Sequence, residues 1–305
     1  MSIPAGHSDP NSTSSGSAPV AIDHERLAQL RAKTAVVRRI NLFPIKSIEG
    51  FEIDRIAAHP NGGLQADRRY AFFSQTHGGW IRAKDFPQLL RIRARFDLPR
   101  NTVSVATEAG GREFDLALER PAFNDWMSAF LAHPVALKES PAGGFFDDSK
   151  KDRFGVSLIS TATLQRLAAW FPGLALDELR RRLRTNIEVD GVEPFWEEAL
   201  IPHAAEAAAA STQRPALAIG PARFAVALSC PRCSVPERNS RTADLDPAFR
   251  SRFATMREAT LPRFVEPSAY KTMYSVAIRL QSQPLADTAV APVIAVGDAV
   301  QFCSL

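Results

Sequence analysis

Residues 36–42 read VVRRINL, and they open a series of short β-type runs that continues to residue 106. Clusters of turn residues separate the runs, for example PNGG at residues 60–63 and HGG at residues 77–79. Short strands punctuated in this way predict a sheet or a small barrel, and not a parallel sheet with crossover helices. The expected strands are Val36–Leu42, Ile53–Ala58, Tyr70–Phe73, Leu90–Phe96 and Thr102–Ala106.

Helical periodicity appears at both ends of this β-rich region. Leu27 and Leu30 predict a short helix over Asp23–Lys33, after a Ser-, Gly- and Pro-rich tail that is expected to be disordered. A second helix carries one apolar stripe. The stripe consists of Phe123, Trp126, Met127, Phe130 and Leu131. The Gly-rich, charged stretch Pro141–Lys151 then predicts a boundary between domains.

The second half of the chain mixes strands with helices. Ser160 or Thr161 is expected to cap one helix, and another helix begins near Asp177. A third helix is predicted with Asp246 at its cap and Pro247 at its first position. The expected strands are Val156–Ile159, Asn186–Val189, Phe224–Leu228, Tyr274–Leu280, Val293–Val296 and Ala299–Phe302.

The composition is that of an ordinary globular protein. The 305 residues are 45% hydrophobic and 23% charged, which excludes collagen-like, coiled-coil and wholly disordered chains. The net charge of +4 is spread over a large surface and favours anionic ligands only weakly. Three cysteines, no secretory signal and no long apolar run predict a cytoplasmic chain without a membrane segment.

The Cys230-Pro-Arg-Cys233 sequence admits several interpretations. Structural zinc needs four ligands, and a redox pair needs a helix after its first cysteine. The sequence around Cys230 and Cys233 shows neither feature, so both interpretations are disfavoured. One thiolate could bind a soft metal while Arg232 beside it holds an anion. Two strand-end cysteines without a chemical role remain an equal alternative.

Three other groups of residues could bind an anion. Lys46 and Ser47 directly follow a strand, and Arg68 lies after the flexible Gly62–Gly63 pair. The run from Arg180 to Asn186 is mostly expected to be a solvated helix face. Arg184 and Asn186 are different, because they lie where the helix gives way to a strand and side chains can point into a cleft.

Taken together, seven segments in this order resemble the MOSC family, named after the C-terminal domain of molybdenum cofactor sulfurase. The resemblance extends over residues 36–303 and includes family members similar to the amidoxime-reducing component. The segments are Asn41–Ser47, Gly63–Arg69, Arg82–Leu89, Arg184–Asn186, Glu193–Glu197, Cys230–Cys233 and Val296–Val300.

The resemblance implies a mainly β (α+β) fold with a two-domain β-barrel MOSC architecture and a few packed helices. A disordered tail and short helix would occupy residues 1–33, a MOSC N-terminal β-barrel domain 34–140, a linker 141–152 and the MOSC domain 153–305. It implies molybdenum cofactor (molybdopterin), with Cys233 as the catalytic thiolate on molybdenum. The pterin and its phosphate would be held by Lys46, Ser47, Arg68, Arg184, Asn186 and Arg232, with Ser160 and Thr161 as further candidates at a helix start.

The resemblance further implies an oxidoreductase that reduces N-hydroxylated or N-oxide small molecules. Clustered cysteines for an iron–sulfur domain are missing, so a separate iron–sulfur or flavin protein would supply electrons. The chain departs from the reductases after Cys233, where SVPERNS replaces their threonines and Val-Asp-Pro-Xaa-Thr-Gly stretch. The alternative is a non-catalytic carrier of cofactor or sulfur. Base-stacking aromatics among basic residues are missing, so neither nucleic acid nor a membrane is expected as a partner.

Overall fold

The computed structural model of the chain describes residues 22–140, 144–146, 155–203, 215–283 and 290–305. The expected tail and most of the expected linker lie outside the described residues. The α-helices are α1 (His24–Arg31), α2 (Arg120–Leu131), α3 (Thr161–Ala168), α4 (Leu176–Leu183) and α6 (Phe249–Ala259), and the 3-10 helices are η1 (Pro87–Arg91), η2 (Trp196–Leu200), η3 (Val235–Glu237) and η4 (Pro267–Ala269). The strands are β1 (Ala35–Leu42), β2 (Phe51–Glu52), β3 (Arg55–Ala57), β4 (Tyr70–Ser74), β5 (Arg93–Asp97), β6 (Thr102–Thr107), β7 (Gly110–Asp115), β8 (Val135–Glu139), β9 (Val156–Ser160), β10 (Ile187–Asp190), β11 (Pro215–Ile219), β12 (Ala222–Pro231), β13 (Ser275–Ser282), β14 (Val293–Ala295) and β15 (Ala299–Ser304).

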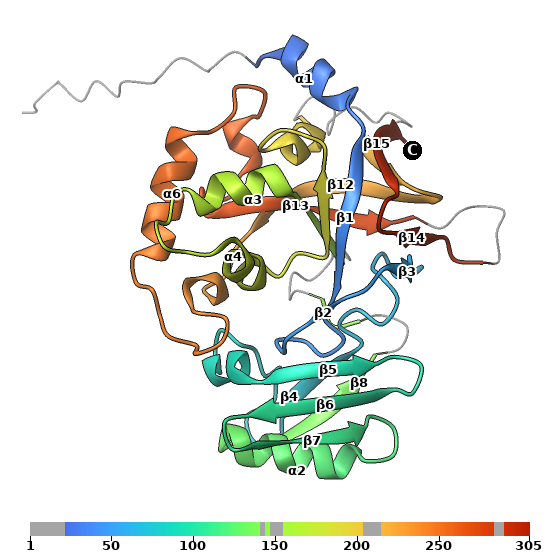
Figure 1. Cartoon of the computed structure of the whole chain (residues 1–305), viewed down its shortest axis with the longest axis vertical. Helices are drawn as coiled ribbons and strands as arrows, with labels where there is room; N and C mark the ends of the chain where they lie inside the picture. Colours follow the sequence, from blue (N-terminus) through green and yellow to red (C-terminus); the bar gives the residue numbers. More distant parts are fainter. Residues whose placement is uncertain (1–21, 141–143, 147–154, 204–214, 284–289) are drawn as a thin grey trace, which may run out of the picture.

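Seven of these strands form a closed β-barrel, which confirms the expected mainly β, α+β fold class (Figure 1). Their order is β10-β9-β13-β12-β11-β15-β1, and the pairing of β1 with β10 closes the ring. The β9–β10 pair is parallel and the other six pairs are antiparallel. β2 pairs with the C-terminal end of β1 and extends the sheet there. A closed ring leaves little unpaired strand edge, so the barrel is a rigid support for the loops at its rim.

Alternating side chains fill the barrel. Along β1, Val37, Ile40 and Leu42 are buried, whereas Val36 is 43% exposed. Successive side chains on a strand point to opposite faces, so this pattern sends one face of β1 into the core. α3, α4 and α6 cover one side of the barrel, and the stacked rings of Phe171 and Phe249 lie between them, with centroids 4.4 Å apart.

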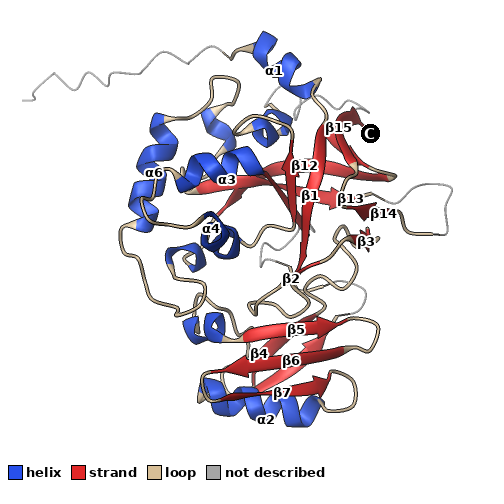
Figure 2. Ribbon diagram, viewed as in Figure 1, coloured by secondary structure: helices blue, strands red, loops and turns tan. Residues whose placement is uncertain are grey.

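A smaller α+β unit lies against one end of the barrel (Figure 2). β5, β6 and β7 form a three-stranded antiparallel sheet, β4 pairs with β8, and α2 packs on them. Phe123 of α2 packs edge-on against Phe72 and stacks on Phe114, with ring centroids 5.2 and 4.8 Å away. This unit therefore has its own aromatic core.

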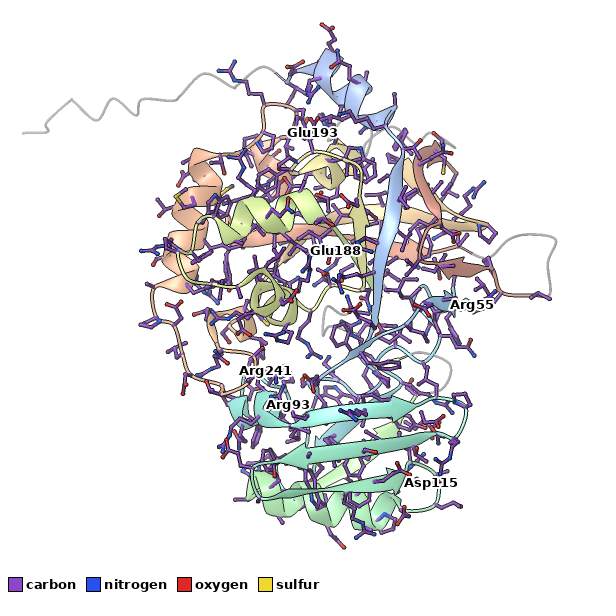
Figure 3. The ribbon with its side chains drawn as sticks, in the orientation of Figure 1. Arg55, Arg93, Asp115, Glu188, Glu193 and Arg241 are labelled. Atoms are coloured by element: carbon purple, nitrogen blue, oxygen red, sulfur yellow. The ribbon has the colours of Figure 1, made fainter. Side chains whose placement is uncertain are left out.

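The two units exchange segments, so they do not divide simply at the expected linker. β1 lies within the predicted 34–140 domain but is a wall of the barrel, where it pairs with β10 and β15. In the opposite direction, Val235 and Ala243 from the second half pack on the core of the small unit. Figure 3 shows Arg93 beside Arg241 at this junction, where Arg93 Nη2 donates to the Arg241 carbonyl at 3.4 Å.

Most of the expected elements are present with shifted ends. β1, β4, β6, β9, β10, β13 and β15 coincide with predicted strands, and α1 and α2 with predicted helices. The expected strand Leu90–Phe96 is wrong at its start, because Pro87 begins the 3-10 helix η1, which buries Leu89 and Leu90 together. The sequence did not indicate β7, β8 or β11.

The predicted start of the third helix is also wrong. α6 begins at Phe249 with Ala248 at its cap, and the Asp246 carboxylate only accepts a bond from the Ala248 N–H at 3.2 Å. Residues Phe249 and Phe253 face the core as expected, and Arg257 is buried beside them. In the described part of the chain, no helix is long and apolar enough to cross a membrane.

Candidate functional site

A cavity of about 190 Å³ lies between the barrel and the small unit. Its lining comes from the loop after β1, the turn before β4, the α4–β10 corner and the end of β12. Seven of the nine predicted site residues line it together: Lys46, Ser47, Arg68, Arg184, Asn186, Arg232 and Cys233. Sequence segments nearly 190 positions apart therefore meet at one place.

The two cysteines of the Cys-Xaa-Xaa-Cys sequence have different environments. Cys230 is the penultimate residue of β12 and is buried, whereas Cys233 follows the strand and is exposed at the cavity. Arg232 Nη1 donates to the Cys230 sulfur at 3.2 Å, and its Nη2 donates to the Leu183 carbonyl. Its Nε is buried with no hydrogen-bond partner among the described residues. Cys233 is thus the accessible thiol, and Cys230 helps to orient Arg232.

Arg68 and Asn186 are joined through a buried carboxylate. Asp67 Oδ2 accepts from Arg68 Nη1 and from Asn186 Nδ2, the latter at 3.1 Å. Its Oδ1 accepts from the Phe43 N–H at 2.9 Å. Burial raises the pKa of Asp67, although the charge of Arg68 acts in the opposite direction. Because Asn186 also accepts from Ser157, these bonds hold the turn before β4 against β9 and β10.

Arg184 lies between α4 and β10, as the sequence predicts. It is the C-cap of α4 in a left-handed conformation, and its Nη2 donates to the Ile48 carbonyl at 2.7 Å. Burial, and secondly the nearby charge of Arg68, lower the pKa of Arg184 to about 9, so it remains a cation at neutral pH. It forms no ion pair with any described carboxylate, and the charges of Asp67, Cys233 and Glu49 act on it only at longer range. This charge is available to an anionic ligand.

The cavity is strongly basic. Six basic side chains and no carboxylate line it within the described part of the chain. The sequence predicted four of these six side chains. It did not indicate Arg182 and Arg279, and it wrongly placed Arg182 on a solvated helix face. Arg182 is buried and pairs with Glu178 at 2.8 Å. A net positive, partly desolvated lining is suited to a phosphate-bearing ligand.

Unusual backbone conformations also gather at the cavity. Ser47, Arg68 and Arg184 have positive φ angles of 71°, 50° and 53°. Such angles are uncommon for residues other than glycine and are often found at functional sites. The Lys46 ammonium also donates to the Phe146 carbonyl at 2.9 Å across the cavity.

Ser160 and Thr161 are not brought to the cavity. The Ser160 hydroxyl is fully buried and accepts from the Thr163 N–H at 3.1 Å, so it caps α3 itself. Thr161 donates to the buried Glu188 at 2.9 Å. Neither residue therefore lies with the other seven predicted site residues, and both hydroxyls satisfy groups of the fold.

The protein supplies few groups that could bind a metal ion. In the parts of the chain that the structure describes, no cluster of three or more His, Cys, Asp or Glu side chains is arranged to bind a metal. Cys233 is therefore the accessible soft ligand at the cavity, and a metal there would need most of its ligands from a bound group.

The protein thus joins a closed barrel to a small α+β unit, with a basic cavity and an exposed thiol between them. Residues 34–142 match the family model of the MOSC N-terminal beta barrel domain. This match supports the resemblance to the MOSC family and does not address the similarity to the amidoxime-reducing component.

Among solved structures, the chain is similar to the YuaD protein from Bacillus subtilis. The two are 12% identical, the alignment covers 90% of this chain and 97% of that chain, and the TM-score is 0.35. No curated protein matches the sequence.

Proposed function

We propose that this protein binds molybdenum cofactor in the cavity between its two units and reduces N-hydroxylated or N-oxide small molecules. The supporting observation is that a single exposed thiol, Cys233, shares the cavity with six basic side chains. When bound, the cofactor supplies the two-electron redox chemistry that removes an oxygen atom from the substrate.

The residues present fit this ligand. Cys233 offers a thiolate, the ligand type that soft transition metals prefer. Arg68, Arg184 and Arg232 would bind the anionic pterin phosphate, and the buried, unpartnered Nε of Arg232 is a donor without an acceptor in the described chain. Lys46 and Ser47 would add an ammonium and a hydroxyl donor, while Asn186, whose amide N–H groups donate to Asp67 and to the Asn41 carbonyl, would hold the turn that carries Arg68.

The overall reaction needs two electrons and two protons, and it converts an N–OH group to N–H with release of water. The sequence has only three cysteines, one fewer than an iron–sulfur cluster held by four cysteine thiolates needs. We therefore propose a separate iron–sulfur or flavin protein as the electron donor. Cys230, Cys233 and Cys303 are free thiols, which suits the reducing cytoplasm as the compartment.

A turnover assay tests this function. The full chain is produced in cells that make molybdenum cofactor and is mixed with reduced viologen dye and an aryl amidoxime. We expect dye oxidation and amidine formation with the wild type and with Cys303→Ser, a matched free thiol outside the cavity. The same activity should be lost in Cys233→Ser.

The carrier alternative predicts a different result. A carrier would bind the cofactor, transfer it to a cofactor-free acceptor enzyme, and show no amidine formation. That outcome would overturn the reductase proposal.

A further inference from the structure

Phe43 packs behind the basic cavity, against two of the arginines that line it, although it bears no charge and the sequence did not indicate it. It follows the last residue of β1 and is 6% exposed. The guanidinium carbons of Arg184 and Arg68 lie 4.3 and 4.8 Å from the centroid of its ring. One phenyl ring therefore contacts the guanidinium groups of two cavity-lining arginines that lie far apart in the sequence.

The ring itself is held firmly. The Phe43 N–H donates to Asp67, and its carbonyl accepts from the Arg68 N–H at 2.9 Å. The ring packs directly on Gly50, where an added Cβ would lie 2.4 Å from a ring carbon. Only glycine allows such a close approach, so the ring cannot move toward that side.

The Phe43 ring lies against two guanidinium groups of like charge. Arg68 and Arg184 repel each other, and this repulsion contributes to the lowered pKa of Arg184. Asp67 pairs directly with Arg68, whereas Arg184 is in no ion pair among the described residues and feels Asp67 and Glu49 only as nearby charges. The negative face of an aromatic ring attracts both guanidinium groups without neutralising either. Arg184 therefore keeps its charge for a ligand, and Arg68 is held beside it while it also pairs with Asp67.

We propose that Phe43 is a positioning residue, whose ring fixes the guanidinium groups of Arg68 and Arg184 as a two-cation site for the phosphate of an anionic ligand. The assignment rests on the proposed function for the nature of that ligand. The contacts of the ring with the two arginines do not depend on it. A leucine of similar bulk could fill the space but would not attract the cations.

The experiment uses the full chain prepared without cofactor. Phe43→Leu removes the aromatic face, and Phe43→Tyr retains it. Phe302→Leu is the matched control, because Arg31 lies 4.9 Å from the centroid of that ring and neither residue lines the cavity. Thermal unfolding of each variant reports on the fold, inorganic phosphate is the probe ligand, and molybdenum content is measured on protein from cofactor-producing cells.

Two readouts separate positioning from general stability. Side-chain Nε–H signals of Arg68 and Arg184 are assigned in NMR spectra by their loss in Arg68→Lys and Arg184→Lys. We expect both signals to show the ring-current shift of Phe43 in the wild type and in Phe43→Tyr, and to lose it in Phe43→Leu. Phosphate affinity should fall about tenfold in Phe43→Leu and stay within about twofold in Phe43→Tyr and Phe302→Leu.

The outcomes are distinct for the two proposals. An unchanged phosphate affinity in Phe43→Leu, an equal loss in Phe43→Tyr, or wild-type arginine signals without a ring-current shift would overturn the positioning role. A wild type that purifies without molybdenum, but whose phosphate affinity still depends on the aromatic ring, would contradict the proposed function and retain the positioning role.

Discussion

Glu197, in the Phe195-Trp196-Glu197 segment, offers a quantitative test of the buried charges in the barrel. Its side chain is fully buried in η2 next to Glu198, and its Oε2 accepts from Thr163 at 3.1 Å. Burial, and secondly the charge of Glu198, raise the pKa of Glu197 from its ordinary 4.5 to about 7. The folded protein therefore retains a proton that the unfolded chain releases.

The sign and size of the effect follow from this difference. A raised pKa in the folded state stabilises the fold fully below pH 4.5, and the contribution is lost as the pH rises through about 7. Linkage between the two pKa values gives a loss of about 2.5 kcal/mol between pH 5 and pH 8. Glu197→Gln removes the titrating group and with it this part of the pH dependence.

The assay is urea unfolding of the wild type, Glu197→Gln and the exposed control Glu258→Gln at pH 5 and pH 8. Relative to the wild type, Glu197→Gln should gain about 2.5 kcal/mol in its free energy of unfolding between the two pH values. Glu258→Gln should run parallel to the wild type. A constant difference between Glu197→Gln and the wild type at both pH values would refute the reasoning.

Two further substitutions test how the site and the N-terminal helix are held. Gly50→Ala forces a Cβ to within 2.3 Å of the Leu42 carbonyl oxygen and against the Phe43 ring. Urea unfolding should therefore show a free energy of unfolding lower by about 1–3 kcal/mol. A change below about 0.5 kcal/mol would contradict this packing. Leu30→Ala empties a fully buried position of α1 and should cost about 2–5 kcal/mol, whereas Leu118→Ala, at a position 83% exposed, should cost less than about 0.5 kcal/mol. Equal effects of these two leucine substitutions would show that α1 does not dock as described.

Local pattern was sufficient for much of the fold. The short apolar run at Val36–Leu42 predicted β1, and Leu27 and Leu30 predicted α1, whose first turn Asp23 caps by accepting from the Arg26 N–H at 2.9 Å. The closure of the barrel depends instead on pairing between β1 and β10, about 150 positions apart, and on the irregular register between Val37 and Arg39. Periodicity carries no information about either feature.

In the site, too, the sequence indicated some residues, whereas the role of others depends on contacts in the folded chain. Motif order selected seven residues that the structure brings to one cavity, whereas Ser160 and Thr161 lie elsewhere and their hydroxyls serve the fold. Phe43 and Asp67 were missed as functional residues, because a phenylalanine after a strand has the pattern of ordinary core and an Asp-Arg neighbour pair that of a solvated turn. Their importance arises from contacts with Arg184 and Asn186, which only the folded chain creates.

Molybdenum content per chain tests the central claim most directly. It is measured, with zinc and iron, on wild type, Cys233→Ala, Cys230→Ala and Cys303→Ala from cofactor-producing cells. The account predicts near-stoichiometric molybdenum in the wild type, its loss in Cys233→Ala, and retention of most of it in the other two variants. Molybdenum that is absent from the wild type, or unchanged in Cys233→Ala, would contradict the account.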